Sequence, residues 1–70
     1  MLGDEIRKSR TDAGLTQEEL AFRAGLSRNY ISLLELDQKS PTVQVLFRIC
    51  RALGVKASKL IERVEHKGGE

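Results

Sequence analysis

A chain of 70 residues with 40% hydrophobic and 31% charged side chains has the composition of one small globular domain, not of a disordered segment. It has no apolar run near the roughly 18 residues of a membrane span, and its opening, MLGDEIRKSR, lacks the apolar core of a secretory signal. We therefore expect a cytoplasmic protein with no membrane partner. The net charge of +2, from 12 basic and 10 acidic residues, favours a polyanionic partner only weakly.

Helical patterning runs through the whole chain, and no stretch alternates as a β-strand does. The pattern predicts an all-α domain over residues 1–66, followed by a tail at 67–70 that we expect to fray. Its five predicted helices cover about residues 2–13, 17–24, 28–36, 43–53 and 57–64.

Side chains that cap a backbone N–H mark the starts of three predicted helices. Thr16 and Glu19 form the S/T-x-x-E capping box of the second helix, in which each side chain accepts the other residue's N–H. Ser27 is a good N-cap for the third helix and Thr42 for the fourth. The helix starts are therefore specified locally.

The second and third predicted helices meet at Gly25 and form a helix-turn-helix pattern. A joint this short needs a backbone conformation that a residue with a Cβ adopts only at a cost of about 1 kcal/mol or more. Apolar residues that would pack the two helices across one another are Leu20, Ala24, Leu26, Ile31 and Leu34. The third helix is thus expected to be held outward at a fixed angle.

That third helix should present a partly polar outer face. Arg28 and Asn29 lie in its first turn, where a helix entering the major groove touches base edges. Arg can pair bidentately with guanine and Asn with adenine, and Ser32 can donate or accept. Leu33 and Leu36 are apolar on the same face, so either they cap the edge of the core or Leu33 contacts a thymine methyl group.

The fourth and fifth predicted helices carry more apolar surface than one small core requires. The expected core stripe of the fourth helix is Val43, Leu46, Ile49, Cys50 and Leu53. Phe47 lies off that stripe, and Ile61 and Val64 add further apolar area in the fifth helix. Since small domains often gain stability by associating, we predict a two-fold interface at Phe47, Ile61 and Val64. The alternative is that these residues close the end of the core.

Three motifs, IRKSRTDAGLTQEELA, AGLSRNYISLLE and SPTVQVLFRICRALGV, resemble the Cro/cI-type (XRE) family of helix-turn-helix regulators over about residues 2–64. The resemblance implies a five-helix, lambda-repressor-like DNA-binding domain in which the second and third helices read DNA. It places the base-reading positions at Arg28, Asn29, Ser32 and Leu33. It places phosphate contacts at Gln17, Arg10, Lys39, Ser40 and Thr42.

The same resemblance implies a partly buried salt bridge between Arg10 and Glu35, with ordinary surface charge as the alternative. The family often has Gly or Asn just after this glutamate, where the present chain has Leu36 and Asp37. Because Asp tolerates the left-handed conformation, the loop is expected to persist with altered detail.

These features predict a sequence-specific transcriptional regulator that binds a palindromic double-stranded DNA operator as a homodimer, with the third helix in the major groove. Its setting would be phage Cro/repressor-like, restriction–modification controller-like or that of a stand-alone regulator. The alternative is a protein-interaction module, such as an antitoxin-like or adaptor subunit. Such a module would have no need for Arg28 and Asn29 beside a capped helix start.

An enzyme is not expected, because the chain offers no constellation of catalytic groups. His66 lies next to the expected tail without a plausible partner, Cys50 is the only cysteine and lies among apolar neighbours, and no glycine-rich phosphate loop is present. We therefore expect no catalytic residue, no metal and no cofactor. We interpret basic residues such as Arg7 and Arg48 as parts of solvated helix faces or as neighbours of DNA phosphates.

Overall fold

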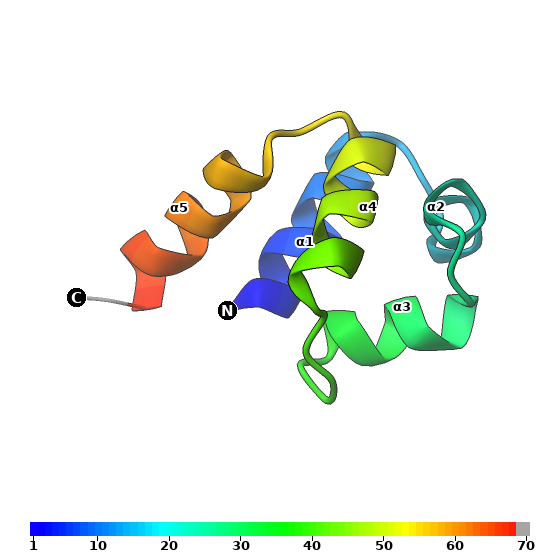
Figure 1. Cartoon of the computed structure of the whole chain (residues 1–70), viewed down its shortest axis with the longest axis horizontal. Helices are drawn as coiled ribbons and strands as arrows, with labels where there is room; N and C mark the ends of the chain where they lie inside the picture. Colours follow the sequence, from blue (N-terminus) through cyan, green and yellow to red (C-terminus); the bar gives the residue numbers. More distant parts are fainter. Residues whose placement is uncertain (69–70) are drawn as a thin grey trace.

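The structure, a computed structural model, describes residues 1–68, with side chains described as far as Glu65. Within these residues it contains α-helices and no β-strand (Figure 1), so the expected all-α class is confirmed. The helices are α1 (Leu2–Asp12), α2 (Gln17–Ala24), α3 (Arg28–Glu35), α4 (Val43–Leu53) and α5 (Ala57–Gly68).

The predicted caps form. Thr16 Oγ1 accepts the Glu19 N–H at 3.1 Å, and Glu19 Oε1 accepts the Thr16 N–H at 2.8 Å. Ser27 and Thr42 each accept the N–H three residues further on, at 3.0 and 3.1 Å. Gly25 ends α2 in the left-handed conformation with φ of 70°, so the joint has the geometry that glycine permits.

One apolar core holds the helices together. In Figure 1, α1 and α4 lie in the middle of the molecule, with α2 and α3 at one end and α5 at the other. Helix α2 packs against α3 and α4, while α1 packs against α3 and α5. The buried apolar residues are Ile6, Leu15, Leu20, Ala21, Ala24, Ile31, Leu34, Leu46, Ile49, Cys50, Leu53 and Leu60. They lie on all five helices and in the α1–α2 connection, so the core fixes the angle between α2 and α3.

Helix boundaries differ from the expected ones mainly at the end of the chain. Helices α1 and α3 each end one residue early, within the usual uncertainty of assignment. Helix α5 continues to Gly68, so the expected end at Val64 is wrong. Residues 65–67 have ordinary helix propensity and include neither proline nor glycine, so nothing stops the helix there. Residues 69–70 of the expected tail lie outside the described residues.

The expected core stripe of α4 also needs one correction. The Val43 side chain is 66% exposed, whereas Val45 is half-buried and packs against the core. On a helix these two residues lie on opposite flanks of the stripe made by Leu46, Ile49 and Leu53. In the first turn of α4, Val45 is covered and Val43 is not.

Candidate nucleic-acid interface

The exposed side of α3 brings together the four residues predicted to read bases. Arg28 and Asn29 are exposed in the first turn, while Ser32 and Leu33 are half-buried further along the helix. Ile31 and Leu34, on the opposite side, are 0% and 1% exposed. Helix α3 therefore rests on the core along one face and offers polar side chains at its N-terminal end.

The first turn of α3 has no acidic residue, so no carboxylate offsets the positive end of the helix dipole there. Arg28 adds a full positive charge at that end. Leu36, at the other end, is 58% exposed, which places it outside the core. The charge arrangement favours an anionic partner near Arg28 and Asn29.

The loop between α3 and α4 carries three residues predicted to contact phosphates. Lys39 and Ser40 are exposed in it. Thr42 Oγ1 accepts the Val45 N–H at 3.1 Å as the cap of α4, so its own hydroxyl proton remains available for donation. These side chains can reach an anion without disturbing the helix that follows them.

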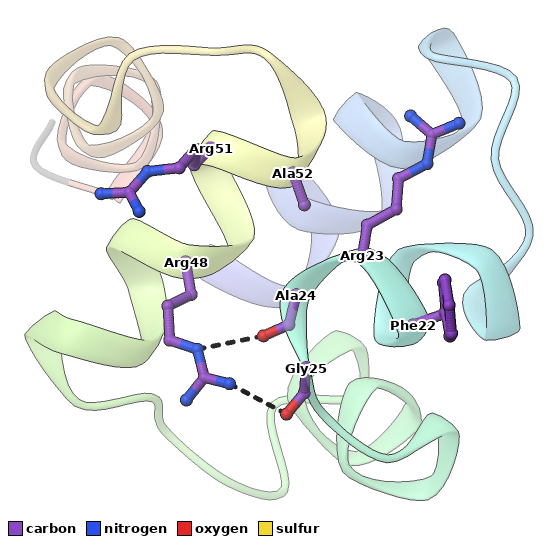
Figure 2. Close-up of a pocket in the computed structure, with 7 residues that line it drawn as sticks. All are labelled: Phe22, Arg23, Ala24, Gly25, Arg48, Arg51 and Ala52. Carbon is purple, nitrogen blue, oxygen red and sulfur yellow. Dashed lines mark hydrogen bonds between the residues drawn. The ribbon is translucent and has the colours of Figure 1, made fainter.

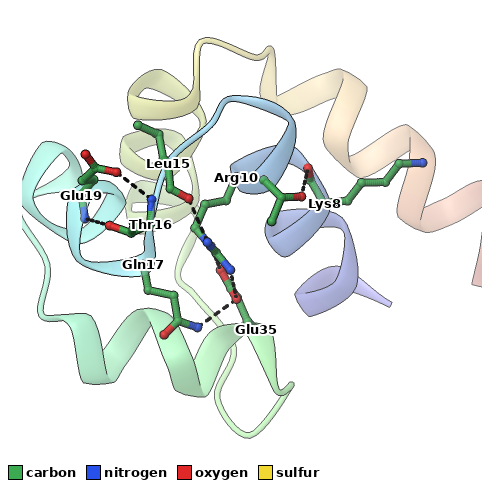
Figure 3. Close-up of polar contacts among 8 residues, drawn as sticks. Lys8, Arg10, Leu15, Thr16, Gln17, Glu19 and Glu35 are labelled. Carbon is green, nitrogen blue, oxygen red and sulfur yellow. Dashed lines mark hydrogen bonds and ion pairs between the residues drawn. The ribbon is translucent and has the colours of Figure 1, made fainter.

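Arg10 and Glu35, the residues expected to pair, lie in contact beneath the start of α2 (Figure 3). Arg10 Nε is 2.6 Å from Glu35 Oε2, and Arg10 Nη2 donates to Glu35 Oε1 at 3.2 Å. Arg10 Nη1 also donates to the Leu15 carbonyl at 2.9 Å. The two side chains are 13% and 3% exposed, so this is a nearly buried ion pair.

Gln17 joins the same network, since its Nε2 donates to Glu35 Oε1 at 3.0 Å. Both Gln17 and Arg10, which were predicted to bind phosphate, therefore turn side-chain donors inward toward Glu35. The N–H of Gln17 lies at the first position of α2, where backbone donors lack intrahelical partners. The Gln17 N–H can therefore donate to an anion at the start of α2.

Asp37 holds the loop after α3 against the beginning of α1. It has φ of 58°, the left-handed conformation expected for it, and its Oδ1 accepts the Gly3 N–H at 2.9 Å. A Cβ at Gly3 would lie 2.6 Å from the Leu34 carbonyl oxygen, so only glycine allows this approach. No local sequence pattern indicates this contact, because the two residues are 34 positions apart.

Arg48 is a second residue whose role was missed. The sequence predicts a solvated face or a phosphate neighbour there, whereas the Arg48 guanidinium donates to the carbonyls of Ala24 and Gly25 (Figure 2). It lines an open depression together with Phe22, Arg23, Ala24, Gly25, Arg51 and Ala52. Phe22, at the rim, is 86% exposed. No local pattern marks Arg48, because its partners lie more than 20 residues away.

Apolar side chains predicted to form an interface are accessible. Phe47 on α4 is 50% exposed and Ile61 on α5 is 48% exposed, while Val64 is half-buried. Val43 lies four residues before Phe47, on the same side of α4, and is exposed too. The surface of α4 and α5 thus carries large apolar groups that this chain does not cover.

Among the described residues, Glu19 and Cys50 have shifted pKa values. The backbone N–H and then the hydroxyl of Thr16 lower the pKa of Glu19, and the nearby charge of Arg23 adds to this effect. Burial raises the pKa of the Cys50 thiol.

Among the described residues, no three His, Cys, Asp or Glu side chains gather where they could hold a metal ion. No helix in that part of the chain has the length and apolar character of a membrane span.

Comparison with known proteins gives consistent matches over most of the chain. The helix-turn-helix family model HTH_3 matches residues 6–60. An uncharacterized HTH-type transcriptional regulator, y4dJ of Sinorhizobium fredii, is 39% identical over 61 residues, covering 87% of this chain and 79% of that protein. The crystal structure of the clp gene regulator ClgR from C. glutamicum aligns with a TM-score of 0.90 at 31% identity, over 96% of this chain and 87% of that one. The restriction-modification controller protein C.AhdI from Aeromonas hydrophila aligns with a TM-score of 0.82 at 34% identity, over 84% and 89% of the two chains.

Proposed function

This chain belongs to the helix-turn-helix family of transcriptional regulators, and we propose that it binds a palindromic double-stranded DNA operator as a homodimer, with α3 in the major groove. The observation that carries the proposal is the exposed pair Arg28 and Asn29, in the first turn of a helix whose opposite face is buried. Helices that enter the major groove contact base edges through their N-terminal residues.

Base reading is assigned to the exposed flank of α3. The Arg28 guanidinium can pair bidentately with guanine, and the Asn29 amide with adenine. Ser32 hydrogen-bonds a neighbouring base edge, and Leu33 contacts a thymine methyl group. These contacts supply the sequence preference, since backbone contacts alone carry no sequence information.

Phosphate contacts come from both sides of α3. Lys39, Ser40 and Thr42 bind the backbone from the loop before α4, and the backbone N–H of Gln17 binds it from the start of α2. Arg10 acts indirectly, because its donors already hold Glu35 and Leu15. Neutralised phosphates release counterions, so operator affinity should fall steeply as the salt concentration rises.

Dimerisation is assigned to Phe47, Ile61 and Val64, whose apolar groups are accessible in the single chain. One eight-residue helix reaches only a few base pairs. Two copies of α3 about 34 Å apart would enter successive major grooves and read the two half-sites of a palindrome.

Selection of bound sites from random duplex DNA at about 150 mM salt tests the proposal, since non-specific binding is weak at that ionic strength. A palindromic motif with half-sites about one helical turn apart is expected. No enrichment by the folded protein would refute it and favour a protein-interaction module.

Arg28→Ala should then weaken binding to the selected site by about 1–3 kcal/mol, the worth of one bidentate base contact. Arg51→Ala is the matched control, because it removes the same charge from an exposed position on α4, away from α3. Equal effects of the two substitutions would show that Arg28 supplies charge and does not read a base.

A further inference from the structure

The Arg48 side chain of α4 hydrogen-bonds the turn between α2 and α3. Arg48 Nε donates to the Ala24 carbonyl at 3.0 Å, and its Nη2 donates to the Gly25 carbonyl at 2.9 Å. Figure 2 shows the guanidinium lying across these two successive carbonyl groups, with the neighbouring arginines directed elsewhere. Arg48 therefore hydrogen-bonds both the last residue of α2 and the glycine that follows it.

Two properties of the joint explain why an arginine suits this place. The final carbonyls of a helix have no intrahelical N–H partner, and a cation is favoured at the negative end of the helix dipole. Within the joint itself, the Leu26 N–H donates to the Ala21 carbonyl at 2.8 Å. The Ala24 and Gly25 carbonyls accept hydrogen bonds from Arg48, because its planar guanidinium can donate to two acceptors at once.

Gly25 has a second use here besides its backbone conformation. A Cβ at this position would lie 2.5 Å from Arg48 Nη2, so a side chain would collide with the guanidinium. The glycine therefore also leaves the space through which Arg48 reaches the joint.

The joint leads directly to the reading end of α3. Ser27, the N-cap, follows Gly25 by two residues, and Arg28 comes next. The other end of α3 is already tied to α1 through Glu35 and Arg10. We propose that Arg48 is a positioning residue for DNA reading, which fixes the N-terminal end of α3, and with it Arg28 and Asn29, relative to α4. This inference rests on the proposed function of α3.

The test compares Arg48→Met with Arg51→Met in the full chain. Both substitutions remove one arginine from the same helix, but the Arg51 side chain makes no hydrogen bond within the described part of the chain, whereas that of Arg48 makes two. The measured quantity is the ratio of affinities for the selected operator and for random duplex DNA. Arg48→Met should lower this ratio about tenfold, as partial loss of a bidentate base contact would. Arg51→Met should leave it unchanged.

Arg48→Lys separates positioning from simple loss of stability, and it also serves if the methionine variant is too unstable to measure. Lysine keeps the charge but lacks the fork that spans two carbonyls, so the ratio should recover only partly. If the ratio in Arg48→Met or Arg48→Lys equals that in Arg51→Met, Arg48 is only a stabilising cap and the proposal is overturned.

Amide hydrogen exchange tests, without DNA, whether Arg48 holds the turn through its bonds to the Ala24 and Gly25 carbonyls. A negative result here can therefore be told from failure of the proposed function. In the Arg48 variants the Leu26 amide should exchange about tenfold faster relative to amides of α1, as expected for local opening of the turn. Unchanged relative exchange would show that Arg48 does not hold the turn. If the Leu26 amide exchanges faster in the Arg48 variants but the wild-type protein prefers no DNA sequence, the role of Arg48 in DNA reading fails together with the proposed function.

Discussion

Replacing Arg10 with methionine tests the nearly buried ion pair beneath the start of α2. Methionine retains much of the apolar stem but removes every donor of the guanidinium. Glu35, whose side chain is 3% exposed, would keep only the amide of Gln17 as a hydrogen-bond partner from this network. The Leu15 carbonyl would lose its bond from Arg10 as well.

The size of the effect follows from this burial. Removing one partner of a buried pair costs about 3–5 kcal/mol, because an uncompensated charge is left behind. A domain of 70 residues is stable by only about 4–10 kcal/mol in total. Arg10→Met should therefore remove a large part of the free energy of unfolding. The double variant Arg10→Met/Glu35→Leu should recover most of it, since replacing both charges by apolar groups is often neutral.

Urea unfolding followed by circular dichroism gives these free energies by linear extrapolation. Protein concentration must be the same for every variant, because dimerisation would contribute to apparent stability. Arg7→Met is the matched control on the same helix. Arg7 pairs with Asp4 at 3.2 Å, but both side chains are more than half exposed, at 55% and 60%. Its loss should cost about 0–1 kcal/mol.

A cost below about 1 kcal/mol for Arg10→Met would refute this reasoning, since that is the range for exposed pairs. An additive double variant would refute it as well. In either case the Arg10–Glu35 contact would be incidental, and Arg10 would be free to serve as a phosphate ligand.

If the proposed dimer forms through Phe47, Phe47→Lys should convert it to monomer in sedimentation; a dimer that survives this substitution would place the interface elsewhere. Thr16 lowers the pKa of Glu19, so the stability from this carboxylate is present above its ordinary pKa of 4.5 and is lost as pH falls through the lower folded value. The melting temperature of Glu19→Gln should therefore fall less than that of wild type on acidification, and parallel curves would exclude this contribution. Burial raises the pKa of Cys50, so its reaction with a disulfide reagent at pH 8 should be more than about tenfold slower in folded than in urea-unfolded protein. Equal rates would show that the thiol is accessible.

The sequence by itself determined the local features of this protein. Ser27, Thr42 and the Thr16–Glu19 box cap helices through bonds that span three residues, so they can be recognised without knowing the fold. Gly25 likewise marks its turn, because the positive φ there disfavours any residue with a Cβ. The amphipathic pattern of 28–35 also distinguished buried Ile31 and Leu34 from the exposed flank of the helix.

Tertiary structure decided the features that depend on how helices approach one another. Val43 and Val45 flank the same stripe of α4, and only the packing of neighbouring helices determined that Val45 is covered. Arg48 reaches the Gly25 carbonyl across 23 residues, and Asp37 reaches Gly3 across 34. Helical periodicity fixes the direction of a side chain around its own helix, whereas the crossing angles of five packed helices determine which distant group it meets.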